Sequence, residues 1–137
     1  MESPHAPARR SASERIWLWG PVPLYCALIF SLSSVSNVPA LPGGMSDKTA
    51  HALLYSGLGF LFVRALSGGI DRPVSPSMVL MSVAFAAVYG LSDEFHQLFV
   101  PLRQFDLKDT AADIIGSGIG SGLLWLWGIL RRFRHAR

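Results

Sequence analysis

The chain has 137 residues, of which 50% are hydrophobic and only 15% are charged, and its formal net charge is +3. A soluble domain carries about 25% charged residues, so this composition, with a mean hydropathy of +0.37, indicates a single membrane domain. The basic residues lie at the edges of apolar blocks and not along one face, which argues against a nucleic-acid partner.

Four apolar blocks are each predicted to form a transmembrane helix: Ile16–Val35, Thr49–Leu66, Ser77–Leu91 and Thr110–Leu130. The third is short for a span, and its helix could continue to Phe99, before Pro101. The segments between the blocks are predicted as loops, at 36–48, 67–76 and 100–109. The expected fold is therefore an all-α, four-helix membrane domain at 15–132, with a disordered tail at 1–14 and a basic tail at 133–137.

Local signals refine these boundaries. Pro21 and Pro23 stand near the start of the first block, where a helix tolerates proline, and Ser46 is a plausible N-cap for the second helix. Gly116 and Gly120 form a G-x-x-x-G pair, which predicts close packing against another helix. A cleavable signal peptide ending near Val38–Ala40 is a competing interpretation of the first block. It is disfavoured because the apolar stretch is long and proline lies beside the cleavage position.

Basic residues predict the topology. Nine would lie on one side of the membrane: Arg9, Arg10, Arg15, Arg64, Arg72, Arg131, Arg132, Arg134 and Arg137. Three would lie on the other: Lys48, Arg103 and Lys108. The positive-inside rule then places both termini and the 67–76 loop in the cytoplasm. Trp17, Trp19, Trp125 and Trp127 would form an aromatic belt near that surface.

Polar residues gather in three segments that would meet at the outer face. They are Asp47, Lys48, His51 and Tyr55; then Asp93, Glu94, His96, Gln97 and Arg103; then Asp106, Asp109 and Asp113. Spacings of three and four residues place Asp47, His51 and Tyr55 on one helical face, and likewise Glu94 with Gln97. We interpret one set as functional: Glu94, Gln97, Arg103 and Asp109. Asp93 and His96 are interpreted as ordinary interfacial residues.

Asp113 should lie about one turn inside the fourth helix. An ionised Asp near the bilayer centre costs roughly 2.5–3.5 kcal/mol, and less toward the interface, so such a residue is normally paired or functional. Two interpretations are equally favoured for Asp113. It either takes part in function or locks the helices by pairing with Lys48 or Arg103.

Several chemistries are open for this outer cluster. The second and fourth helices begin there, and their N-termini favour an anion such as a phospholipid or polyprenyl-phosphate head group. Alternatively, three carboxylates could cap the helices or hold a hard divalent cation: Asp47, Asp106 and Asp109. A transition-metal set would be His51, His96, Glu94 and Asp109. No compact metal, nucleophile-elbow or P-loop motif is present, so no cofactor is assigned and the divalent cation is a candidate only.

Together the three segments resemble the VanZ-like family of membrane proteins, named for a teicoplanin-resistance protein. The matching pieces, within about residues 30–122, are Asp47-Lys48 with His51 and Tyr55, Glu94-x-x-Gln97 with Pro101-x-Arg103, and Asp109 with a polar residue at 113 before Gly116 and Gly120. The chain departs from the family at Asp113, where the usual residue is Asn. The resemblance implies a multi-pass membrane protein, here expected in the bacterial inner membrane with both termini cytoplasmic. It also implies an association with reduced glycopeptide susceptibility.

Two function classes follow for this envelope protein. In the first, it recognises a membrane lipid head group or a lipid-linked wall precursor: Arg103 and Lys48 hold phosphate, and Glu94, Gln97 and Asp109 shape the pocket. In the second, it is a membrane enzyme on the same lipids: Glu94 or His51 is the general base, Asp109 holds a metal and Arg103 stabilises phosphate charge. A small proton-coupled transporter is a third alternative, and the sequence leaves open whether the chain forms an oligomer.

Overall fold

A computed structural model describes residues 10–36 and 42–135. Its elements in chain order are α1 (Ala12–Trp19), α2 (Pro21–Ser33), a 3-10 turn η1 (Pro42–Gly44), α3 (Asp47–Ser67), α4 (Pro76–Gln97) and α5 (Leu107–His135). Within these ranges the fold is all-helical. Four helical segments are long and apolar enough to cross a membrane, with α1 and α2 counted together. The predicted all-α bundle of four membrane helices is confirmed, whereas its orientation across the membrane stays a prediction.

Serine caps fix where the helices begin. Ser46 accepts the backbone N–H of Thr49 at 3.2 Å, which confirms it as the N-cap of α3. Ser75 caps α4 in the same way, with Pro76 in the first turn, where its missing N–H costs nothing. α3 ends at Gly68, whose φ of 87° is the left-handed conformation that glycine adopts most readily.

The boundaries differ from the prediction in two helices. The first block forms two helices that meet at Gly20, because Pro21 starts a new first turn, and α1 begins at Ala12, ahead of Ile16. The predicted continuation of the third helix beyond Leu91 is confirmed: α4 extends to Gln97, which gives it the length of a full span. α5 runs from Leu107 to His135 and so includes part of the expected basic tail. The predicted disorder at residues 1–9 and the candidate cleavage position at 38–40 lie outside the described residues.

α3 and α5 pack face to face through glycine. A Cβ on Gly116 would overlap the backbone carbonyl of Ala52, and one on Gly120 would overlap that of Ser56. Gly59 on α3 meets the backbone of Ser117 in the same manner. The predicted G-x-x-x-G contact is therefore confirmed, and it brings the polar residues of α3 close to those of α5.

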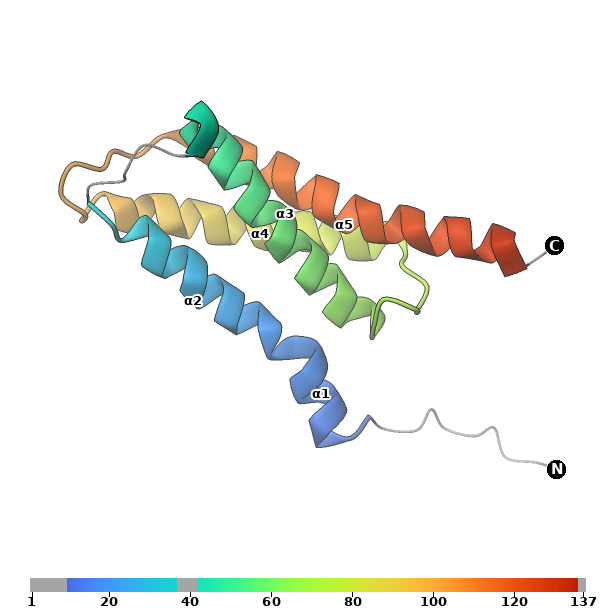
Figure 1. Cartoon of the computed structure of the whole chain (residues 1–137). Coiled ribbons are helices and arrows are strands. Elements are labelled where there is room, and N and C mark those ends of the chain that lie inside the picture. Colours follow the sequence, from blue (N-terminus) through green and yellow to red (C-terminus); the bar gives the residue numbers. More distant parts are fainter. Residues whose placement is uncertain (1–9, 37–41, 136–137) are drawn as a thin grey trace, which may run out of the picture.

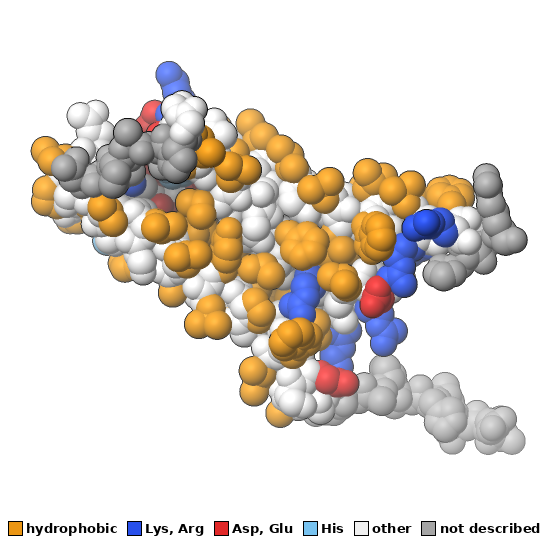
Figure 2. Space-filling model, in the orientation of Figure 1, with side chains coloured by type: hydrophobic (Ala, Val, Ile, Leu, Met, Phe, Trp, Pro, Cys, Tyr) orange, Lys and Arg blue, Asp and Glu red, His pale blue; other side chains and the backbone are white. Residues whose placement is uncertain are grey.

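The helices run antiparallel and create two chemically different ends (Figure 1). At one end, α2 and α4 finish while α3 and α5 begin; we call this the polar end. At the other, which we call the arginine end, α1 starts, α3 connects to α4 and α5 finishes. The arginines at this end, among the described residues, are Arg10, Arg15, Arg64, Arg72, Arg131, Arg132 and Arg134. Figure 2 shows large apolar side chains on the surface between the two ends, as contact with lipid requires.

Candidate functional site at the polar end

His51 on α3 and Asp113 on α5 form a buried polar contact. Nδ1 of His51 lies 2.9 Å from Oδ1 of Asp113. An ionised carboxylate can only accept, so the imidazole donates through Nδ1. Gly90 on α4 leaves space for this carboxylate, since a Cβ there would overlap Oδ2 of Asp113. Asp113 therefore pairs with His51, and the expected alternative of a pair with Lys48 or Arg103 is wrong.

Lys48 connects the first turn of α3 to the start of α5. Its Nζ donates to Oδ2 of Asp106 at 2.9 Å and to Oδ1 of Asp109 at 2.7 Å. Asp106 also accepts the backbone N–H of Lys108. The Lys48 ammonium and the Lys108 N–H hold the pKa of the Asp106 carboxyl below its usual range. Two carboxylates balance the charge of Lys48, so it is not the free cation that the phosphate-holding role requires.

Glu94 and Gln97 lie on the face of α4 that points into the site. Glu94 is fully buried, and its Oε2 accepts the backbone N–H of Asp106 at 2.8 Å. Nε2 of Gln97 lies 3.5 Å from Oε1 of Glu94 and 3.2 Å from Oδ2 of Asp93. The shared face predicted for Glu94 and Gln97 is confirmed. Glu94 ties α4 to the loop that precedes α5.

Asp93 and His96 face the end of α2. Asp93 is buried and accepts a 2.5 Å hydrogen bond from Oγ of Ser33. Nε2 of His96 lies 3.1 Å from Oγ of Ser34, and its ring lies 4.4 Å from that of Phe30. α2 covers this side of α4 and presents serines to it, so Asp93 is buried in a helix contact. The interpretation of Asp93 and His96 as residues without a functional role stays a prediction.

Four buried polar atoms in the described part of the chain have no hydrogen-bond partner. They are Oη of Tyr55, Nε of Arg103, Oγ1 of Thr110 and Oδ2 of Asp113. All four belong to the polar half of the bundle, where α3 and α5 begin. An unsatisfied buried donor or acceptor costs about 1–3 kcal/mol, and hydrocarbon offers no water to relieve it. The atoms that the fold leaves unpaired are thus concentrated where the sequence predicted the site.

Sequence reasoning missed Thr110. A threonine at the start of an apolar block is unremarkable by composition. Its position three residues before Asp113 was the available signal, because that spacing puts the hydroxyl on the face of α5 that carries the carboxylate.

One group of side chains has the geometry to hold a cation. Potential ligand atoms of Asp47, His51 and Asp109 all lie within 4.8 Å of one another. Since Nδ1 of His51 faces Asp113, Nε2 is the nitrogen that would serve as ligand, with Asp113 orienting the ring as a second carboxylate does in many metal sites. The ammonium of Lys48 lies on Asp109 and would compete with the ion. His96 lies against α2, so the alternative set that includes it is not brought together.

A family model, VanZ/LLP1, matches residues 14–128. The chain belongs to the VanZ/LLP1 family. The match extends beyond the region on which the resemblance rested and takes in most of α1 and α5, so it covers most of the membrane bundle. All three polar segments of this VanZ-family chain lie inside it.

Similarity to individual proteins is more distant. The chain is 26% identical over 96 residues to the uncharacterized protein C11E3.10 of Schizosaccharomyces pombe. The aligned part covers 70% of this chain and spans 57% of the yeast protein, so the chain spans little more than half the length of this relative. No solved structure matches.

Proposed function

We propose that this VanZ-family protein binds the head group of a membrane lipid at its polar end. The observation that carries the proposal is the set of four unpartnered polar atoms. If these residues served stability alone, each of these atoms would have a hydrogen-bond partner or be replaced by an apolar group, because an unpartnered buried polar atom destabilises the fold. A polar guest that enters from the membrane would satisfy them.

The chemistry of these atoms limits the guest. Nε–H of Arg103 is a donor and suits a phosphate oxygen, whereas Oδ2 of Asp113 is an acceptor and needs a hydroxyl or ammonium group. The hydroxyls of Tyr55 and Thr110 serve in either direction. The guest must therefore offer donors and acceptors together, as a phosphate head group with an amine or sugar does. In this proposal Arg103 holds the phosphate, and Lys48 positions Asp106 and Asp109.

The finer biological role is part of the same proposal. A lipid-linked wall precursor carries a phosphate beside hydroxyl-rich groups, so it meets the requirement as well as a phospholipid does. Binding such a precursor would influence glycopeptide susceptibility by changing how accessible the precursor is to the antibiotic. The arrangement that fits is an inner-membrane protein with the polar end outside and both termini in the cytoplasm, since seven of the nine arginines predicted for the inner side are described at the opposite end.

The proposal is tested by mass spectrometry of lipids that co-purify with the full chain in mild detergent. Arg103→Ala and Thr110→Val each remove one unpartnered group, and the second keeps nearly the same side-chain volume. Gln104→Ala is the matched control, because this exposed residue lies beside Arg103 in the same loop. We expect one lipid class to be enriched in wild type and in the control but reduced in both test variants. Identical lipid profiles in all four proteins would overturn the proposal.

A catalytic role is a second candidate, favoured by the contact between His51 and Asp113. A histidine whose Nδ1 is fixed by a carboxylate presents Nε2 as a general base, and Glu94 and Asp109 lie in the same cluster. Catalysis requires turnover. Incubation of the purified protein with the enriched lipid, with and without a divalent cation, should release a product that His51→Gln does not form. An unchanged lipid under both conditions excludes this candidate.

A further inference from the structure

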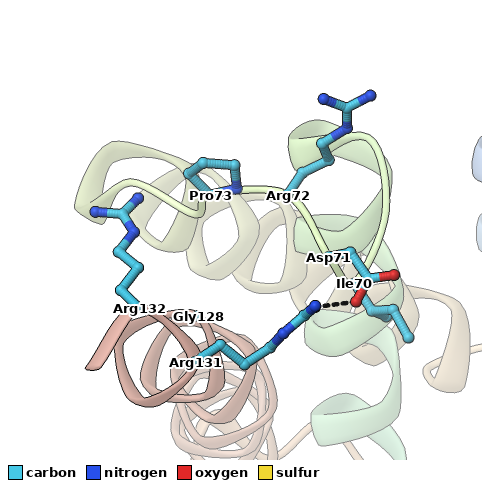
Figure 3. A pocket seen from close by; sticks show the side chains of 7 residues that line it. All are labelled: Ile70, Asp71, Arg72, Pro73, Gly128, Arg131 and Arg132. Carbon is cyan, nitrogen blue, oxygen red and sulfur yellow. Dashed lines mark hydrogen bonds and ion pairs between the residues drawn. The ribbon is translucent and has the colours of Figure 1, made fainter. Parts of the chain in front are cut away.

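The arginine end contains a cavity that the family resemblance does not explain. It has a volume of about 390 Å³ and lies between the α3–α4 loop and the last turns of α5. Figure 3 shows its lining: Ile70, Asp71, Arg72, Pro73, Gly128, Arg131 and Arg132. The cavity is therefore at the opposite end of the bundle from the site described above.

The charges that line this cavity are unbalanced. Arg131 is paired with Asp71, which joins α5 to the loop on one side of the cavity. Arg72 and Arg132 have no carboxylate within ion-pair distance among residues 10–36 and 42–135. Both side chains are exposed and lie on either side of Pro73, and the guanidinium group of Arg72 points away from Arg132 (Figure 3). The lining thus carries two uncompensated guanidinium groups, one from the loop and one from α5. Guanidinium groups bind phosphate through paired N–H donors.

The surroundings of the cavity are amphipathic. A neighbouring cavity of about 430 Å³ is lined by Trp127, Leu130 and Phe133, with Arg131 shared between the two. Trp127 and Phe133 are exposed, as they would be in contact with acyl chains. Tryptophan and arginine at one level along a membrane helix mark the boundary between hydrocarbon and head groups. This combination beside the cavity is typical of the level at which lipid phosphates lie.

We infer that this cavity binds the phosphate of an anionic phospholipid. Arg132 holds the phosphate together with Arg72, whose exposed side chain turns toward the cavity on binding. The Asp71–Arg131 pair closes one side, and the acyl chains lie along Trp127, Leu130 and Phe133. The inference uses residues far from Arg103 and His51, so it does not rest on the proposed function. If these arginines served only to set the orientation in the membrane, neither the cavity nor the Asp71–Arg131 pair would be needed, and lysine would serve equally well.

The test measures lipid selectivity of the full chain. The protein is reconstituted at about 150 mM salt in nanodiscs that contain phosphatidylglycerol and phosphatidylcholine, and the retained lipids are quantified after extraction into detergent. We expect wild type to retain phosphatidylglycerol preferentially. Arg72→Gln with Arg132→Gln should lower this preference by about 30-fold, because two contacts between phosphate and guanidinium are lost.

Two further variants separate a built site from general electrostatics. Arg72→Lys with Arg132→Lys preserves charge and topology but loses the paired N–H geometry. We therefore expect its preference for phosphatidylglycerol to lie between that of wild type and that of the double glutamine variant. Arg15→Gln removes an exposed charge that lines none of these cavities, and its preference should equal that of wild type. An undiminished preference in the double glutamine variant, or an equal loss in Arg15→Gln, overturns the inference.

Free phosphate is the other source of the same chemistry. Inorganic phosphate at 10-fold excess over lipid is added to the wild-type nanodiscs before extraction. Unchanged retention supports a lipid site, because the apolar walls contribute to holding it. Displacement of phosphatidylglycerol by phosphate would show that the cavity selects the free ion, and the lipid inference would fall. Arg103→Ala should leave this selectivity unchanged, so the two proposals fail independently.

Discussion

Replacement of Asp113 measures what the contact between α3 and α5 contributes to stability. Asp113→Ala removes the acceptor for Nδ1 of His51, which is buried, and such a loss costs about 1–3 kcal/mol for a neutral imidazole and about 3–5 kcal/mol for a charged one. Asp113→Asn keeps an acceptor oxygen and changes only Oδ2, which has no partner. The free energy of unfolding of the asparagine variant should therefore lie within about 1 kcal/mol of the wild-type value.

The assay is equilibrium unfolding of purified protein in mixed micelles with increasing denaturing detergent, followed by circular dichroism. Asp71→Ala and Asp71→Asn are matched controls, because they make the same chemical changes at an exposed ion pair, which contributes about 0–1 kcal/mol. Equal destabilisation by Asp113→Ala and Asp113→Asn would refute the reasoning, since it would mean that the charge itself, and not the acceptor, holds the helices together.

Three other outcomes follow from the structure. Gly120→Ala should destabilise the bundle by about 1–3 kcal/mol because its Cβ meets the Ser56 carbonyl, whereas Gly122→Ala, with open space, should be neutral or slightly stabilising in the same unfolding assay. Single cysteines are placed at Gln104 and at Ile70 in a Cys26→Ser background; in intact cells a membrane-impermeant maleimide should label the cysteine at 104 and not the one at 70, which should react only after the cells are opened. The reverse pattern contradicts the proposed orientation. Chelation of divalent cations should release any head group that a cation at Asp47, His51 and Asp109 bridges, and lipid retention unchanged by the chelator excludes the bridge.

The membrane fold was predictable because its signals are strong and local. Three signals each act within one helix or one helix contact: the apolar blocks of spanning length, Ser46 before the second helix, and the spacing of Gly116 and Gly120. The structure confirms all three. The division of the first helix at Gly20 was not predicted. Proline tolerance in a first turn is compatible with one continuous helix or with two, and nearby sequence does not decide between them.

The candidate site was predicted by position but not by partner. Spacing correctly placed Glu94 beside Gln97, because those two residues share one helix. The partner of Asp113 depends on how α3 is rotated against α5, and the partner of Asp93 depends on where α2 ends. Neither relation is encoded in a single helix. Charge alone therefore favoured Lys48 or Arg103 as the partner of Asp113, where the fold brings His51, and it gave no partner for Asp93, to which the fold brings Ser33.

The balance of charge at the polar end restricts what it binds. Its described carboxylates outnumber its lysine and arginine side chains by six to three: Asp47, Asp93, Glu94, Asp106, Asp109 and Asp113 against Lys48, Arg103 and Lys108. Lys48 is already shared by two of these acids. A purely anionic head group would meet repulsion there, since carboxylates lie in a medium of low dielectric. Phosphate beside Arg103 therefore has to arrive with its own positive charge, as an ammonium group on the same head group or as a divalent cation held by Asp47, His51 and Asp109.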